Sequence, residues 1–226
     1  TSYRPYCTSY SSSTLQDING YYTSTVYYFR FDPIIWKVLE LDETNNKVFL
    51  FANIALDAQD YFYNYNLTRT IDGKTVYQNN YEYSTIRSWL NDNFYNTAFT
   101  KEEQQIILDT LVDNSVLSTG YTPNQNACND TIDKIFLLSY SDVVNSKYGF
   151  ISYISRQLKS TDYAKAQGCV KSTSTSYLGN CNWWLRSPVR NLSNNACYVD
   201  YNGYVGGYIY VNRTLLGVVP ALWISI

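Results

Sequence analysis

Hydrophobic and polar positions alternate in short runs along the first part of the chain. β-Branched and aromatic residues fill residues 26–31, 34–41 and 47–52. Asp32-Pro33 separates the first two runs, and a polar stretch over residues 42–46 separates the next two. Short apolar runs bounded by turn-forming residues are typical of antiparallel strands. The pattern therefore predicts consecutive strands at the start of the domain.

The spacing of apolar residues becomes helical after residue 83. Ser84 can cap a first helix, whose apolar face carries Ile86, Trp89, Leu90 and Phe94. Thr100 and Glu103 form a capping-box pattern that opens a second helix. We expect this second helix to bury the stripe Ile106, Ile107 and Leu111. Residues 134–138 predict a further strand, and residues 139–147 a short helix that ends at Gly149.

A polar insert lies between two apolar, tryptophan-bearing runs near the C-terminus. The flanks are Trp183–Pro188 and residues 217–224, and the insert covers residues 189–216. It is rich in Asn, Tyr and Gly, and it contains no Lys, Glu, Gln, Met or Trp. Asn202-Gly203 predicts a hairpin turn. Alternation then predicts two sets of side chains: an inward set of Val199, Val205, Ile209 and Val211, and an outward set of Tyr198, Tyr204, Tyr208 and Tyr210.

The order of elements predicts an α+β fold with a mixed antiparallel sheet, two helices and long loops. We expect residues 1–25 to form an extended lead-in and residues 26–226 to form one domain. Because the early and late strands are both strongly apolar, we expect them to share a sheet.

Composition excludes several classes of function. The net charge of −2 gives no electrostatic reason to expect a nucleic-acid partner, and no apolar run reaches the length of a membrane span. Histidine is absent, which removes the commonest general base and the commonest metal ligand. We therefore expect no enzyme, no cofactor and no metal site. The 25 tyrosines instead favour a binding surface, because tyrosine is enriched at interfaces.

The cysteines favour an oxidising environment, either extracellular or at the cell surface. Cys169 and Cys181 bracket a Ser/Thr-rich loop and are candidates for a disulfide, and Cys7 is a candidate partner for Cys128. Four cysteines allow three pairings, so both assignments stay open. The alternative is an intracellular protein with reduced thiols.

The two apolar flanks of the insert, Trp183–Pro188 and residues 217–224, resemble segments of bacterial C-type-lectin-fold domains. More narrowly, they resemble the variable proteins of diversity-generating retroelements. In that family a WLRSP-like strand precedes the variable segment, and a GVRPAL-like strand closes it; Val219 departs from the usual arginine. Residues 31–39, 83–91 and 133–139 also resemble family segments. Diversification of AAC-type codons at their adenines cannot produce Lys, Glu, Gln, Met or Trp. The composition of residues 189–216 obeys that rule.

The resemblance implies a C-type-lectin-like domain that displays a diversifiable binding surface for an unknown protein or glycan ligand. Arg186, in an apolar strand, is expected to pair with a buried carboxylate. The alternatives are a fixed-specificity carbohydrate-binding lectin or adhesin, and an enzyme of the formylglycine-generating type using Cys181 or Cys197. A plain solvated hairpin is the simplest alternative interpretation of the insert. The expected ligand-binding residues are Asn191, Asn194, Asn195, Tyr198, Asp200, Tyr201, Asn202, Tyr204, Tyr208, Tyr210, Asn212 and Arg213.

Overall fold

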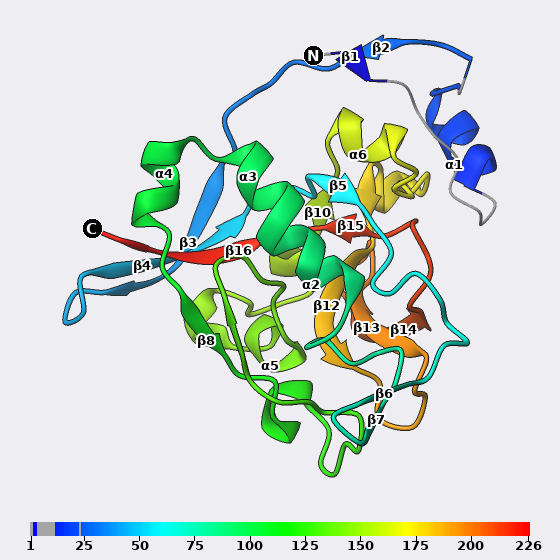
Figure 1. Ribbon diagram of the computed structural model, residues 1–226. Coiled ribbons are helices and arrows are strands. Elements are labelled where there is room, and N and C mark those ends of the chain that lie inside the picture. Colours follow the sequence, from blue (N-terminus) through cyan, green and yellow to red (C-terminus); the bar gives the residue numbers. More distant parts are fainter. Residues whose placement is uncertain (1, 4–11, 23) are drawn as a thin grey trace.

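Two sheets organise the part of the chain that the computed structural model describes, which is residues 2–3, 12–22 and 24–226 (Figure 1). Strands predominate, and the helices between them are short, so the structure is mixed α/β. The strands of the two sheets are β3 (Trp36–Asp42), β4 (Lys47–Ala52), β5 (Asp57–Ala58), β12 (Trp183–Pro188), β13 (Asn195–Val199), β14 (Val205–Tyr210), β15 (Gly217–Val218) and β16 (Ala221–Ser225).

The smaller sheet joins the early and late parts of the domain. Its order is β16-β4-β3, with Ala221 opposite Phe51 and Ser225 opposite Lys47. The predicted strand over residues 47–52 coincides with β4. The expectation that early and late strands share a sheet is therefore confirmed.

The larger sheet has the order β14-β13-β12-β15-β5. All neighbours are antiparallel except β12 and β15, which are parallel at Trp183 and Gly217. The insert supplies β13 and β14, so it forms one edge of this sheet.

Four two-stranded pairs surround these sheets. They are β1 (Ser2–Tyr3) with β2 (Tyr27–Tyr28), β6 (Arg69–Ile71) with β7 (Lys74–Val76), β8 (Thr110–Val112) with β9 (Thr131–Asp133), and β10 (Leu158–Lys159) with β11 (Asn180–Cys181).

Two of the strands predicted from apolar runs are wrong in extent. The run over residues 26–31 contributes only β2, and it pairs with β1 instead of β3. Tyr28 and Phe31 are 78% and 75% exposed, and Phe29 packs on Tyr163 instead of on a neighbouring strand. The run over residues 134–138 is buried, but it makes only an isolated bridge between Phe136 and Ala221.

The helices include the first two that were predicted and further short ones. The short helix predicted over residues 139–147 is divided into α5 and η3, and Gly149 caps the end of η3 as expected. Their bounds are α1 (Ser12–Asn19), α2 (Thr85–Trp89), η1 (Leu90–Phe94), α3 (Tyr95–Ala98), α4 (Lys101–Ile106), η2 (Val116–Thr119), α5 (Tyr140–Val143), η3 (Ser146–Tyr148), η4 (Ile154–Arg156), α6 (Asp162–Ala166) and η5 (Thr175–Tyr177).

Helix starts follow the sequence closely. The Ser84 hydroxyl accepts a hydrogen bond from the Arg87 amide, and Thr100 and Glu103 form the expected capping box. The predicted apolar stripe of α4 is wrong. The helix ends at Ile106, and the backbone at Ile107 is extended. Of the three residues only Ile107 is buried, because Ile106 is 42% exposed and Leu111, in β8, is 70% exposed.

The lead-in is not wholly extended. Residues 12–19 form α1, and side-chain amides of Gln16 and Asn19 donate to the carbonyls of Lys165 and Ala166 at the end of α6. Asn19 also donates to the carbonyl of Cys169 in the following loop. Carbonyls at the end of a helix lack partners within it, and these amides supply them. The remainder of the expected lead-in, residues 1, 4–11 and 23, lies outside the described residues.

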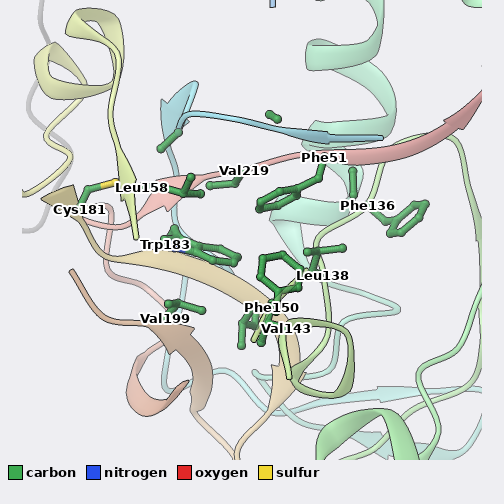
Figure 2. Close-up of a cluster of buried hydrophobic side chains, with 14 of the residues drawn as sticks. Phe51, Phe136, Leu138, Val143, Phe150, Leu158, Cys181, Trp183, Val199 and Val219 are labelled. Atoms are coloured by element: carbon green, nitrogen blue, oxygen red, sulfur yellow. The ribbon is translucent and has the colours of Figure 1, made fainter. Parts of the chain in front are cut away.

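The core lies on both faces of the larger sheet. Alternation along β12 places Trp183 in one apolar cluster and Trp184 in the other, and both are fully buried. Figure 2 shows the first cluster, where Trp183 lies near Phe51 and Val199. Burial on both faces makes β12 and β13 a rigid support for the edge strand β14.

Candidate functional site

The insert forms a hairpin on the edge of the larger sheet. β13 and β14 pair from Asn195–Tyr210 to Val199–Val205, and the turn between them contains Gly203 at a φ of +85°. Only glycine adopts that backbone region without strain. The predicted hairpin at Asn202-Gly203 is therefore confirmed.

Most of the inward set takes its expected place. Val199 and Val211 are fully buried, Val205 is 7% exposed, and Ile209 is partly buried against the second cluster. These side chains belong to the apolar clusters on the two faces of the sheet. They hold the hairpin in place and are not available to a ligand.

The expected ligand-binding residues divide into three groups by exposure. Asn195 is 6% exposed, so its side chain lies within the sheet and it is not part of an open surface. The exposed residues are Asn191, Tyr204, Tyr208 and Tyr210, and the partly buried ones are Asn194, Tyr198, Asp200, Tyr201, Asn202, Asn212 and Arg213.

Tyr198 does not point freely outward as alternation predicted. It lies opposite Gly207, and a Cβ on that glycine would come within 2.5 Å of the Tyr198 ring. The ring therefore lies across the glycine and covers the edge of the sheet. Burial raises the pKa of Tyr198, with a smaller contribution from Asp200.

Side chains from outside the insert hold the backbone of its turn. Arg156 Nε donates to the Gly203 carbonyl at 2.8 Å, and Gln157 Nε2 donates to the Asn202 carbonyl at 3.0 Å. On the other side, Asn180 Nδ2 donates to the Tyr201 carbonyl at 3.0 Å, and Asn182 Oδ1 accepts from the Tyr201 amide at 2.8 Å. The path of the turn is thus set largely by residues outside the insert.

Two polar side chains of the turn also have structural contacts. Asn202 Oδ1 accepts from the Tyr204 amide, and Asp200 Oδ1 accepts from the Tyr201 amide, both at 2.8 Å. Asn202 and Asp200 therefore shape the turn in addition to any contact with a ligand.

Buried asparagines hold the loop that precedes β13. Asn79 Nδ2 donates to the carbonyls of Leu192 and Asn195 at 2.9 and 3.0 Å. Asn126 Nδ2 donates to the Val189 carbonyl at 2.7 Å, and Asn124 Nδ2 donates to the Pro188 carbonyl at 3.1 Å. Sequence reasoning missed these residues, because isolated asparagines in loops give no local signal for such distant partners.

Further tyrosines outside the insert extend the aromatic surface. Tyr153 lies 6.2 Å from Tyr204 between ring centroids, Tyr177 lies 5.6 Å from Tyr201, and Tyr65 lies 5.4 Å from Tyr210. Tyr153, Tyr177 and Tyr65 were not predicted from the sequence, in which the excess of tyrosine was the only signal for them. Apolar side chains beside Tyr153 in the chain, Ile151 and Ile154, are 78% and 77% exposed.

A buried arginine in β12, the strand that pairs with the hairpin, forms an ion pair. Arg186 is 5% exposed, and its Nη1 lies 2.8 Å from Asp142 Oδ2. The guanidinium also donates to the carbonyls of Leu137 and Asp113. The expected pairing of Arg186 with a carboxylate is confirmed, and Val219 is fully buried in the neighbouring core.

The cysteines are all buried or partly buried where they are described. Cys169 and Cys181, the candidate disulfide pair, are free thiols buried in the same apolar cluster. The interaction with the Cys169 thiol, together with burial, raises the pKa of Cys181. Burial raises the pKa of Cys197 to about 12 and that of Cys128 to about 11. The candidate bond between Cys7 and Cys128 involves a residue outside the described part.

The described residues contain no group of three or more His, Cys, Asp or Glu side chains that could hold a metal ion. Within the same part of the chain, no helix is both long enough and apolar enough to cross a membrane.

The fold and the surface define a mixed α/β domain with a sheet-edge hairpin that presents tyrosines to solvent. The chain belongs to the DUF6273 family: the family model, described as a domain of unknown function, matches residues 45–226. No curated protein matches the chain, and no solved structure does. The matched region includes the whole larger sheet with its hairpin and strands β4 and β16 of the smaller sheet, whereas β3 lies before it.

Proposed function

We propose that the chain is a ligand-binding display protein with a C-type-lectin-like domain. In this proposal residues 189–216 form a recognition surface of the type that diversity-generating retroelements vary. The surface faces the exterior of a cell or particle and binds a protein or glycan. Tyr204, Tyr208 and Tyr210 act as its anchors, because tyrosine supplies a large, rigid contact at low entropic cost.

One observation carries the proposal. Side chains from outside the insert hold the backbone of the turn, while the tyrosines next to the turn remain exposed. Arg156, Gln157 and Asn180 contact backbone carbonyls of the turn, so these contacts do not depend on the identity of the side chains there. Tyr204 and Tyr208 are 48% and 59% exposed. A surface of this kind can change its chemistry without losing its shape.

Paired display libraries test this division. The first library randomises the exposed positions Asn191, Tyr204, Tyr208 and Tyr210, and the matched control library randomises the buried positions Ala196, Val199, Val205 and Val211. We expect most members of the first library to resist protease, most of the second to be digested, and binders to protein or glycan targets to come from the first alone. Equal loss of folded members in both libraries would count against the proposal.

The exposed tyrosines also favour the alternative of a fixed-specificity lectin. Tyrosine rings can stack on the apolar faces of sugars without a metal ion. Binding to a glycan array that survives chelation, together with an invariant insert among isolates, would select this alternative. The formylglycine-type alternative needs a reactive cysteine pair. The burial and raised pKa of Cys181 and Cys197 do not favour it.

A further inference from the structure

A separate cavity of about 360 Å³ lies between the chain that leaves β5 and the helical run of α2 and η1. Residues three and four apart share one face of a helix, so the helical wall is a single face. That wall includes Thr85, Trp89, Asp92 and Asn93, and the facing wall includes Gln59 and Asp60. None of these residues belongs to the hairpin surface.

A π-helical turn shapes the helical wall. It covers Leu90–Phe94 and follows directly after Trp89. Leu90 and Phe94 are buried in the second cluster, which anchors the turn from below, while Asp92 and Asn93 line the cavity. Single π-turns within helices are frequent at functional sites.

The lining of the cavity is negative and lacks a compensating cation. Asp60 and Asp92 are its two charged residues, and no Lys or Arg lines it. In the described part of the chain, neither carboxylate takes part in an ion pair. Burial raises the pKa of Asp60 to about 6, against the opposing effect of hydrogen bonds from its own amide and from Thr85. At neutral pH a half-buried carboxylate therefore faces the cavity without an opposite charge.

We infer that this cavity binds an organic cation, an ammonium or guanidinium group, held between the Asp60 carboxylate and the Trp89 indole. A charge-assisted hydrogen bond to a carboxylate is stronger than a neutral one, and tryptophan is the best aromatic partner for a cation. Gln59 and Asn93 add amide groups that can accept from the remaining N–H donors. A divalent metal fits less well, since no set of three suitable ligands gathers in the described residues.

Titration of the full chain with butylammonium, followed by the indole NMR signals, tests the inference. The Trp89 signal is assigned as the one that disappears in Trp89→Phe. We expect a saturable shift of that signal with butylammonium and none with butanol, its neutral counterpart. Asp60→Asn should weaken binding at least about tenfold, as expected for loss of a charged hydrogen-bond partner. Glu43→Gln removes one charge from an exposed turn and should leave binding unchanged.

The pH dependence gives a second readout. Binding should weaken as pH falls from 7.5 to 5, because protonation of Asp60 removes the charge. Asp92 also lines the cavity, and Asp57 in β5 also has a raised pKa. The profile of Asp60→Asn should therefore be flatter than that of the parent.

Two results would overturn the inference: an equal shift with butanol, or unchanged affinity in Asp60→Asn. If the Asp60→Asn variant does not show the dispersed indole signals of a folded chain, the test uses Asp92→Asn instead, because Asp92 is exposed. An unaltered affinity in that variant would also count against the inference.

Discussion

Side chains on the two strands of the β13–β14 hairpin differ widely in exposure. Val199 is fully buried, and Tyr208 is 59% exposed. We expect Val199→Ala to lower the free energy of unfolding by about 2 kcal/mol, from lost apolar burial and an unfilled space. Tyr208→Ala should change it by less than about 0.5 kcal/mol. Urea unfolding of both variants measures this, and equal losses would contradict the division of the hairpin into two sets.

The ion pair of the buried Arg186 predicts a large effect from a single carboxylate. Asp142→Ala leaves the Arg186 guanidinium buried without its charged partner, and this should cost about 3 kcal/mol of unfolding free energy. The matched control is Asp109→Ala, which breaks the more exposed pair with Lys134 and should cost less than about 1 kcal/mol. Denaturant midpoints compare the two, and a similar loss in both would show that Arg186 does not depend on Asp142.

At the scale of elements, the turn of the hairpin depends on one glycine. A Cβ at Gly203 would lie 1.8 Å from the Tyr153 carbonyl oxygen, whereas a Cβ at Gly73 meets nothing within 4 Å. Both glycines have a positive φ, so Gly73→Ala measures the backbone strain alone, about 1–2 kcal/mol. Gly203→Ala should cost about 1–3 kcal/mol more, from forced displacement of the neighbouring loop. Thermal unfolding that ranks Gly73→Ala as the worse variant would be inconsistent with this packing.

Cys169, in the loop after α6, and Cys181, in β11, lie in the same apolar cluster. The contact between the Cys169 and Cys181 thiols predicts that they form a disulfide when the chain folds in an oxidising environment. Burial shields both thiols from solvent and raises the pKa of Cys181. The folded reduced chain should therefore react slowly with oxidised glutathione, and the chain should react quickly during refolding.

Intact mass and peptide mapping after each treatment detect this bond. The matched control is Cys197, which is also buried and should stay unmodified in the folded chain. The bond should raise the free energy of unfolding by about 2–3 kcal/mol. Refolded chains that retain both thiols, or that pair Cys181 with another cysteine, would contradict the assignment.

Local signals made the helix starts and one sheet predictable from sequence. Ser84 and Thr100 cap their helices through residues three positions away, so the chemistry is contained in a short window. The run that became β4 is strongly apolar and paired as expected. The run over residues 134–138 has the same character, yet it makes only a bridge, because strand pairing depends on neighbours that the local sequence does not specify.

At the scale of the whole molecule, buried carboxylates govern the dependence of stability on pH. Asp57 is 6% exposed, and burial raises its pKa to about 7. Its folded-state pKa exceeds the unfolded one, so the folded chain binds the proton more tightly. The stabilisation is complete below about pH 4 and is lost as pH rises towards 7.

We therefore expect Asp57→Asn to flatten the change in melting temperature between pH 4.5 and 7.5. Glu43→Gln, at an exposed position, is the control and should keep the parental slope. The contribution of Asp60, whose raised pKa is about 6, should persist in the Asp57→Asn variant. An unchanged slope in Asp57→Asn would show that this carboxyl does not titrate in that range.

The candidate site was predictable only where it lies within one continuous segment. Composition and alternation located the hairpin and most of its inward residues, because both are properties of neighbouring positions. Tyr153, Tyr177 and Arg156 were missed, since they reach the hairpin from distant parts of the chain. Asn195 was expected on the open surface but is buried. Alternation along the sequence does not show that both faces of β13 are covered.

The central claim is that residues 189–216 vary in nature on a fixed frame. Sequencing the locus from many independent isolates tests it most directly. We expect substitutions to be concentrated in the codons of this segment and to be rare at Val199, Val205 and Val211. They should be confined to positions at which a near-identical DNA repeat, beside a reverse transcriptase gene, carries adenine. An invariant segment with no such repeat would contradict it.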